Sequence, residues 1–194
     1  MRLLSDICKL RKEICSPHES NSQVYVGLEH IDSGRFFLSR HGSPLQVRSA
    51  KSRFYPGDVL YGKLRPYLDK AVVAETEGIC STDILVLEPI EVPPWFLCSV
   101  LHGDAFIEHA KQTTHGVNHP RTSWSGIRMF ETLSLDPLEQ KKIAAVLLKI
   151  QRAIETQEKT IQSFRDLFKT TLNKLMTGEV RVGDLDIDVS EVEV

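Results

Sequence analysis

The run from Pro137 to Thr177 constrains the fold more than any other stretch, because it contains no glycine and, after its first residue, no proline. Its apolar residues step alternately by four and three positions, which is the heptad spacing of a coiled coil. The run therefore predicts one continuous helix that pairs along an apolar seam. The seam, with Thr171 at its one other polar place, consists of Ile143, Leu147, Ile150, Ile154, Gln157, Ile161, Phe164, Phe168 and Leu175.

Both ends of this helix carry the usual start and stop residues. Asp136 can cap the first turn, Pro137 suits the first helical position, and Gly178 follows the last periodic residue. A helix of about 40 residues is roughly 60 Å long, which exceeds the width of a compact domain of this size. We expect it to project and to pair with a helix from a second copy or another subunit. The alternative is a helix that folds back on its own domain.

The rest of the chain indicates an α+β fold: a small globular domain with a mixed or antiparallel sheet and helices, followed by the long helix. Short β-rich pieces at 23–31, 35–38, 58–61, 71–74, 84–87 and 127–135 are separated by glycine and proline, and a helical pattern runs through 94–110. An amphipathic segment occupies 3–14, and residues 32–34 form a turn. We predict a globular domain at 1–135, the helix at 136–178 and an acidic tail at 179–194.

Composition excludes several classes of protein. A hydrophobic content of 41% allows one ordinary core, and no apolar run is long enough for a membrane span, so a soluble cytoplasmic protein is expected. The four scattered cysteines favour reduced thiols over disulfides or zinc ligands. His115 and His119 share the HxxxH spacing of zinc proteases but lack the glutamate, and no helix is expected there. With no phosphate-binding loop or methyltransferase motif, we expect neither an enzyme nor a bound cofactor.

Charge is distributed unevenly along the chain. Between Arg35 and Lys70 there are eight basic residues against two acidic ones, whereas residues 179–194 contain one arginine against six acidic residues. A local basic surface attracts phosphates whatever the net charge. From this segment we take Arg40, Lys51 and Arg53 as candidate contacts to the phosphates of a nucleic acid.

A second candidate group lies near the end of the basic segment. Tyr61, Lys63, Arg65 and Tyr67 are spaced by two, so on an extended strand they would share one face suited to phosphates and bases. A solvated edge strand, whose charges discourage aggregation, is an equally good interpretation.

Three segments together resemble a known family. They are FYPGDVLYGKLRPYLDKAVVAETEGICSTDILVLEP at 54–89, YVGLEHI at 25–31, and LSLDPLEQKKIAAVLLKIQRAIETQEKTIQSFRDLFKTTLNKLMTGEVRV at 133–182. They are similar to the specificity subunit of type I restriction-modification enzymes. In that family a target recognition domain reads one half of a split DNA sequence, and a spacer helix pairs antiparallel with a second one. The usual subunit carries two of each, so this chain resembles a half-length form.

The resemblance implies further DNA contacts and partners. The polar loop THGVNHPRTS at 114–123 takes the place of a family loop that faces DNA; an ordinary surface loop is the alternative. Its candidates are His115, Asn118, His119, Arg121, Thr122 and Ser123. The implied partners are double-stranded DNA, a methylation subunit that binds S-adenosylmethionine, an ATP-dependent restriction subunit and a second copy of this chain. A coiled-coil scaffold or antirestriction decoy without sequence-specific DNA binding is the alternative function.

Overall fold

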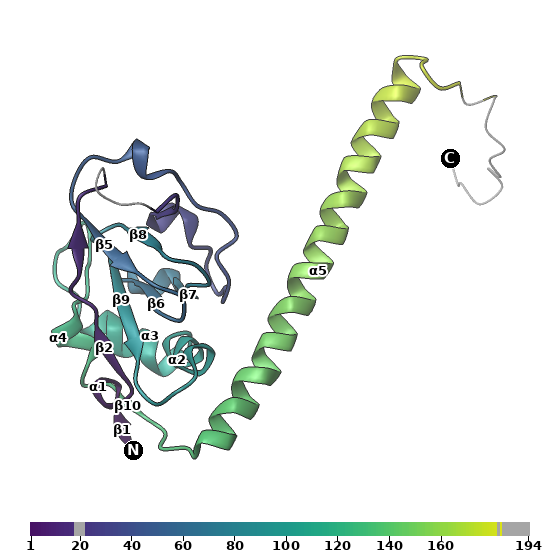
Figure 1. Cartoon of the computed structure of the whole chain (residues 1–194). Coiled ribbons are helices and arrows are strands. Elements are labelled where there is room, and N and C mark those ends of the chain that lie inside the picture. Colours follow the sequence, from purple (N-terminus) through teal and green to yellow (C-terminus); the bar gives the residue numbers. More distant parts are fainter. Residues whose placement is uncertain (18–21, 182, 184–194) are drawn as a thin grey trace. The chain divides into compact units, whose positions relative to one another are not determined.

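The computed structural model describes residues 1–17, 22–181 and 183. The chain forms two compact units, residues 1–151 and a second unit that begins at Arg152, and one helix continues from the first into the second (Figure 1). Most of the acidic tail expected at 179–194 lies outside the described residues. Within the described ranges, no helix combines the length and apolar character that crossing a bilayer requires.

The first unit is built on a four-stranded antiparallel sheet whose order is β2 (Cys8–Leu10), β9 (Ile84–Pro89), β6 (Val59–Gly62), β7 (Ala71–Val73). Successive residues of a strand point to opposite faces. In β6, Val59 and Tyr61 enter one apolar cluster, while Leu60 enters another. Strands β7 and β9 alternate in the same way, so this sheet is buried on both faces.

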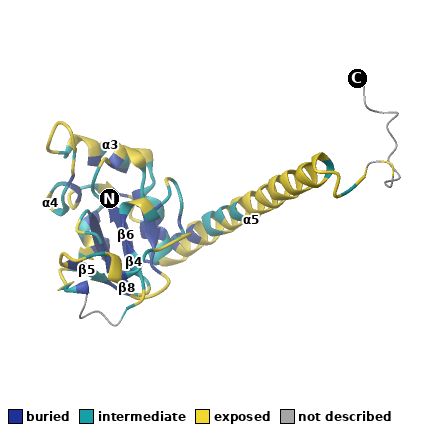
Figure 2. Cartoon of the chain, turned by 90° about the horizontal axis from the view of Figure 1, so that it is seen from above, coloured by how far each residue is buried: buried dark blue, intermediate teal, exposed yellow. Residues whose placement is uncertain are grey.

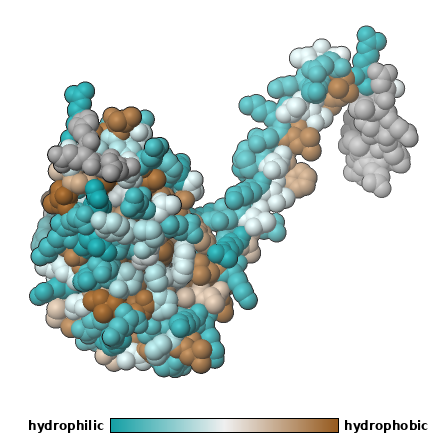
Figure 3. All heavy atoms as spheres, viewed as in Figure 1, coloured by the Kyte–Doolittle hydropathy of each residue, from teal (hydrophilic) through white to brown (hydrophobic). Residues whose placement is uncertain are grey.

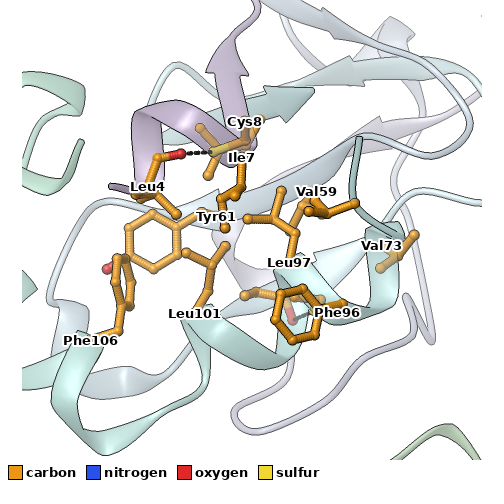
Figure 4. Close-up of a cluster of buried hydrophobic side chains, with 14 of the residues drawn as sticks. Leu4, Ile7, Cys8, Val59, Tyr61, Val73, Phe96, Leu97, Leu101 and Phe106 are labelled. Atoms are coloured by element: carbon orange, nitrogen blue, oxygen red, sulfur yellow. Dashed lines mark hydrogen bonds between the residues drawn. The ribbon is translucent and has the colours of Figure 1, made fainter. Parts of the chain in front are cut away.

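A second sheet and two helices supply the cover. The second sheet has the order β3 (Ile14–Cys15), β5 (Lys51–Phe54), β8 (Gly78–Cys80), β4 (Tyr25–Val26), in which only the β4–β8 pair is parallel. Its residues Phe54, Cys80 and Val26 pack with Leu60. On the other face, helices α2 (Pro94–Leu101) and α3 (Asp104–Gln112) bring Leu97, Leu101 and Phe106 onto Val59 and Tyr61 (Figure 4).

Small elements complete this unit. Strand β1 (Arg2–Leu3) pairs with β10 (Glu131–Thr132), and two one-turn helices, α1 (Leu4–Ile7) and α4 (Trp124–Ile127), follow or precede them. Three short 3-10 helices, η2 (Leu28–His30), η3 (Pro44–Gln46) and η4 (Pro66–Leu68), lie in the connections.

The α+β class is confirmed, with sheets, helices and the long C-terminal helix as expected. The strands expected at 58–61, 71–74 and 84–87 and the turn at 32–34 are present. The prediction of a strand at 35–38 was wrong. Phe36 packs on His102 and Phe37 packs on Trp95. The Phe36 carbonyl accepts one hydrogen bond, from the Val73 amide.

Four other boundaries differ from expectation. The strand expected at 23–31 is confined to β4, and Leu28–His30 form the 3-10 helix η2. The helical pattern at 94–110 is two helices, because the chain turns at His102 and Gly103 between α2 and α3. Segment 127–135 keeps only two strand residues, after α4. Segment 3–14 forms one helical turn and then joins the central sheet as β2, which pairs with β9.

The long helix α5 runs from Pro137 to Met176, within one residue of the expected end. The Asp136 carboxylate accepts hydrogen bonds from the amides of Leu138 and Glu139 at 2.8 and 3.1 Å, and Gly178 follows in the left-handed region at φ 72°. Both expected terminal signals are therefore used.

The first turns of α5 pack on the first unit. Gln140 and Ala144 are buried, Leu147 and Leu148 contact the core cluster, and Gln151 Nε2 donates to the Gly34 carbonyl at 2.9 Å. Leu147, placed in the pairing seam, thus contacts its own domain. The alternative of a helix that packs on its own domain therefore applies to the first turns of α5.

The seam is exposed further along α5. Ile161 is 49% exposed, Phe164 66% and Phe168 70%. Figure 2 shows the far part of α5 mostly in the colour of exposed residues. Helices of this kind gain most of their stability from burying an apolar face. Pairing of this stretch with another helix stays a prediction.

The Asp136 cap predicts a pH-dependent contribution to the stability of α5. The bonds from the Glu139 and Leu138 amides hold the pKa of Asp136 below its usual value. A lowered folded-state pKa gives stabilisation that is complete above the unfolded pKa of about 3.9 and is lost as pH falls through the folded value. At pH 7 we expect Asp136→Asn, which still caps but lacks the charge, to melt below the wild type.

Thermal melts followed by circular dichroism between pH 7 and pH 2.5 would measure this difference. The two proteins should converge at the acidic end. A gap that stays constant across the whole range would contradict a role for the Asp136 charge.

Candidate nucleic-acid interface

Two segments far apart in sequence lie side by side just beyond strand β6. The Lys63 amide donates to the Asp83 carbonyl at 3.0 Å, and the Lys63 carbonyl accepts from the Thr122 amide at 3.0 Å. The Arg65 amide donates to the Pro120 carbonyl at 2.8 Å. These backbone bonds join the Lys63–Arg65 segment to the polar loop, so the structure brings two of the sequence-based candidate groups together.

The polar loop is a tight hairpin, residues 115–121. His115 and Arg121 exchange two backbone hydrogen bonds, at 2.9 and 3.0 Å, which close its base. Gly116 lies in the left-handed region at φ 91°, where a side chain would be strained, and an added Cβ would lie 3.3 Å from the His119 carbonyl oxygen. The turn thus requires glycine and leaves His115, Asn118 and His119 exposed.

An ion pair fastens the hairpin to the body of the domain. Arg121 Nε donates to Asp83 Oδ1 at 2.9 Å and its Nη2 to Oδ2 at 3.3 Å, in the two-pronged geometry that suits guanidinium and carboxylate. The Arg121 hydrogen bonds hold the pKa of Asp83 below its usual value, with smaller help from Lys63 and His119. Arg121 therefore attaches the hairpin to the domain and is also an exposed cation.

Left-handed backbone shapes the neighbouring loop. Arg65, at φ 51°, and Asp69, at φ 48°, flank η4 in a region that residues other than glycine rarely adopt, at an expected cost of about 1–3 kcal/mol each. The Asp69 carboxylate lies 2.6 Å from Nδ1 of His102, whose Nε2 contacts the Ala71 carbonyl at 2.9 Å. Since His102 also stacks on Phe36 at 5.0 Å, Asp69 is held by the core.

The expected row of Tyr61, Lys63, Arg65 and Tyr67 on one strand face was wrong. Strand β6 ends at Gly62, and Arg65 then turns into the left-handed region, so the alternation stops. Tyr61 is 2% exposed, and its ring packs edge-on against Phe106 at 5.4 Å (Figure 4). Only Lys63, Arg65 and Tyr67 of this row reach the surface, and Lys63 is half-buried.

Two further candidates are structural. Lys51 is 6% exposed, and its Nζ donates to the backbone oxygen and hydroxyl of Ser49 at 2.8 and 2.6 Å. Thr122 is buried, with its hydroxyl 2.8 Å from that of Thr113. Neither side chain therefore offers a free polar group at the surface, because the polar atoms of both are bonded inside the domain.

Three of the remaining candidates, Ser123, Arg40 and Arg53, have polar partners within the domain. The Ser123 hydroxyl caps α4 by accepting from the Gly126 amide at 3.3 Å. Arg40 pairs with Asp32 at 2.9 Å, and Arg53 lies 3.5 Å from Glu13. Neither takes part in the backbone bonds of the hairpin. The candidates on the hairpin, or within two residues of a residue in its backbone bonds, are Lys63, Arg65, Tyr67, His115, Asn118, His119, Arg121 and Ser123.

This cluster has the chemistry of a DNA-contacting surface. Lys63, Arg65 and Arg121 are cations, and the nearby carboxylate of Asp83 is bonded to Arg121. The exposed histidines and Asn118 can donate and accept hydrogen bonds, as base edges require. The described residues hold no group of three or more His, Cys, Asp or Glu side chains arranged to bind a metal ion.

The sequence did not reveal the supporting residues Asp83, Asp69 and His102. Each acts through a partner more than 30 positions away, at separations of 38 residues for Asp83–Arg121 and 33 for Asp69–His102. No local pattern marks such pairs, and only an alignment of related sequences could have indicated them.

The ion pair generates a prediction about the hairpin. Asp83→Asn weakens the attachment of Arg121, so we expect faster hydrogen exchange at the amides of His115 and Arg121, which are bonded across the hairpin base. Because the pKa of Asp83 is lowered, the wild-type attachment is intact above the ordinary carboxyl pKa and weakens as pH falls through the folded value.

Amide exchange read by NMR or mass spectrometry checks this. Asp32→Asn, which breaks the Arg40 pair elsewhere, is the matched control and should leave these two amides unchanged. Equal protection in Asp83→Asn and wild type would show that the backbone bonds suffice.

Comparisons with known proteins place the chain beside one group of proteins. No protein-family model matches it. It is 23% identical over 180 residues to the type I restriction enzyme EcoDI specificity subunit of Escherichia coli, covering 90% of this chain and 40% of that protein.

Solved structures give the same result. A chain from a structure of a type I R-M system matches with a TM-score of 0.66 and 18% identity over 96% of this chain and 50% of its own length. The HsdS subunit from Thermoanaerobacter tengcongensis matches with a TM-score of 0.65 and 21% identity, over 88% of this chain and 47% of the subunit. The resemblance to type I specificity subunits and the common fold are thus confirmed, and the chain spans half or less of each relative.

Proposed function

We propose that this chain is a sequence-specific DNA recognition subunit of a type I restriction-modification system and that it reads one half of a bipartite site. The observation that carries the proposal is the joining of the 115–121 hairpin to the Lys63–Arg65 segment by backbone bonds. It stands in a domain whose sequence and fold resemble specificity subunits.

The parts of this surface would divide the work. Lys63 and Arg65 would contact phosphates, which position a protein on the duplex without carrying sequence information. His115, Asn118 and His119 would face base edges from the hairpin. Firm anchoring favours recognition, because a loop already held in shape loses little entropy on binding.

The long helix would set the distance between two such domains. Apolar side chains, shown in brown, alternate with hydrophilic ones along the exposed part of α5 (Figure 3). In a pair of antiparallel helices the two-fold axis crosses the helices and places one recognition domain at each end. Two copies would then read an interrupted palindrome.

Catalysis would belong to partners in this proposal. A methylation subunit would supply S-adenosylmethionine chemistry, and a restriction subunit would supply ATP-dependent cleavage. The chain itself would be non-catalytic and would act in the cytoplasm, where the DNA is.

The second candidate is a coiled-coil scaffold or antirestriction decoy. The exposed seam of Ile161, Phe164 and Phe168 accounts for such a role as well as for paired recognition. A scaffold would respond equally to all DNA sequences.

Selection from a pool of random duplexes distinguishes the two. The full chain is used alone and co-expressed with a type I methylation subunit. Recognition predicts enrichment of one bipartite sequence, whereas an unenriched pool under both conditions would remove the recognition proposal.

The first functional prediction concerns the two cations of the Lys63–Arg65 segment. Lys63→Ala and Arg65→Ala should each weaken DNA binding and lower the slope of log affinity against log salt by about one unit for each phosphate that is no longer neutralised. Binding isotherms between 50 and 300 mM salt measure the slope. Lys12→Ala removes an exposed cation outside the hairpin cluster and serves as the control; slopes equal to its own in both variants would argue against phosphate contacts.

The second functional prediction concerns assembly. The seam from Ile143 to Leu175 has its midpoint near Gln157, so an antiparallel homodimer with full overlap brings the two Gln157 side chains close to its axis. A polar residue at such a place costs stability but fixes register. We expect a dimer in solution, and Gln157→Leu should melt at a higher temperature while populating more than one register or oligomeric state.

Sedimentation at micromolar concentration and thermal melts test this together. Phe164→Asp, in the same seam, should give monomer and serves as the opposite control. A wild-type monomer, or a recognised site whose two halves are unrelated, would exclude the homodimer.

A further inference from the structure

Val117 is the most exposed of the large apolar side chains in the described part of the chain, at 97%. It lies at the tip of the 115–121 hairpin, between Gly116 and Asn118. Single exposed apolar residues are common on protein surfaces, so the position of Val117 matters more than its exposure.

The hairpin holds Val117 outward by construction. The backbone hydrogen bonds between His115 and Arg121 close the base, and Gly116 makes the turn. The ion pair between Arg121 and Asp83 attaches the base to the domain. Valine is branched at Cβ and has few rotamers, so its two methyl groups are presented with little freedom to lose. The tip of the hairpin therefore presents one apolar side chain, Val117, among polar and cationic residues.

The neighbours of Val117 determine what it can meet. On both sides stand exposed groups suited to hydrogen bonds with base edges, and the cations Lys63 and Arg65 are bonded through the backbone to the same loop. A loop tip that enters the major groove, which is about 12 Å wide, meets one apolar group on the base edges, the C5 methyl group of thymine.

We infer that Val117 is a specificity-determining residue that selects thymine at one position of the half-site by packing its methyl groups against the thymine C5 methyl. This inference rests on the proposed function and deepens it, because it names the base and the chemical group recognised. The contact lies in the major groove, since the minor groove presents no methyl group.

The test removes the methyl group from the DNA and from the protein in turn. Duplexes carrying the selected site are made with deoxyuridine in place of each thymine, one at a time. For the wild-type chain, one substitution should weaken binding about fourfold, which corresponds to about 0.8 kcal/mol for one buried methyl group at 1.4 kcal/mol per tenfold. Every other substitution should leave the affinity unchanged.

Val117→Ala completes the cycle. It should bind the thymine duplex more weakly than the wild type and should no longer distinguish deoxyuridine from thymine at the sensitive position. Because Val117 is exposed, the variant should keep the wild-type melting temperature. Leu45→Ala, at a side chain 83% exposed in η3, is the matched control and should keep the fourfold preference.

The outcomes separate the two proposals. If a bipartite site is selected but contains no thymine, if no position responds to deoxyuridine, or if Val117→Ala keeps the response, the inference is overturned and the recognition function stands. A valine used as a wedge in the minor groove would give the second of these results. If no sequence is selected, the recognition function itself fails, and the inference with it.

Discussion

Burial of the central sheet on both faces is the constraint on which the first unit depends. Strands β6, β7 and β9 send alternate residues into two apolar clusters, so none of them has a face left for solvent. Every residue of β6 and β7 is buried, so a polar surface can begin only beyond the ends of these two strands. Lys63 comes directly after β6, and its backbone bonds to Asp83 and Thr122 continue the pairing of the sheet into the loops. The surface cluster is thus an extension of the core's hydrogen-bonding pattern.

The long helix meets two different requirements along its length. Its first turns bury Gln140 and Ala144 and add Leu147 to the core, whereas Phe164 and Phe168 further on are exposed. Burying an apolar side chain is worth about 1.5–3 kcal/mol. The same heptad pattern therefore serves tertiary packing near Pro137 and leaves the rest of the seam available for a second helix.

Local rules predicted the local features of this chain. The ends of α5 were predictable because the cap by Asp136, the proline of the first turn and Gly178 each fix the backbone only a few residues away. The row through Tyr61 and Arg65 failed because the two-residue alternation holds only while a strand continues. Lys51 looked like a surface cation, but its burial depends on how β5 lies in the sheet. Composition does not contain that information. The contact between Lys63 and the hairpin likewise could not be predicted from the sequence, because it depends on backbone hydrogen bonds between segments far apart in the chain.

The way the hairpin is held has a consequence for how such a protein could diversify. Its attachment uses backbone atoms of Lys63, Arg65, Pro120 and Thr122, together with one side-chain pair, Arg121 and Asp83. The side chains from Val117 to His119 are exposed and make none of these hydrogen bonds; from this stretch the His119 backbone carbonyl accepts from Arg121 Nη1 at 3.4 Å. Replacing these three side chains would leave the support in place, so natural selection could explore new contacts at the tip while the stability of the domain stays almost constant.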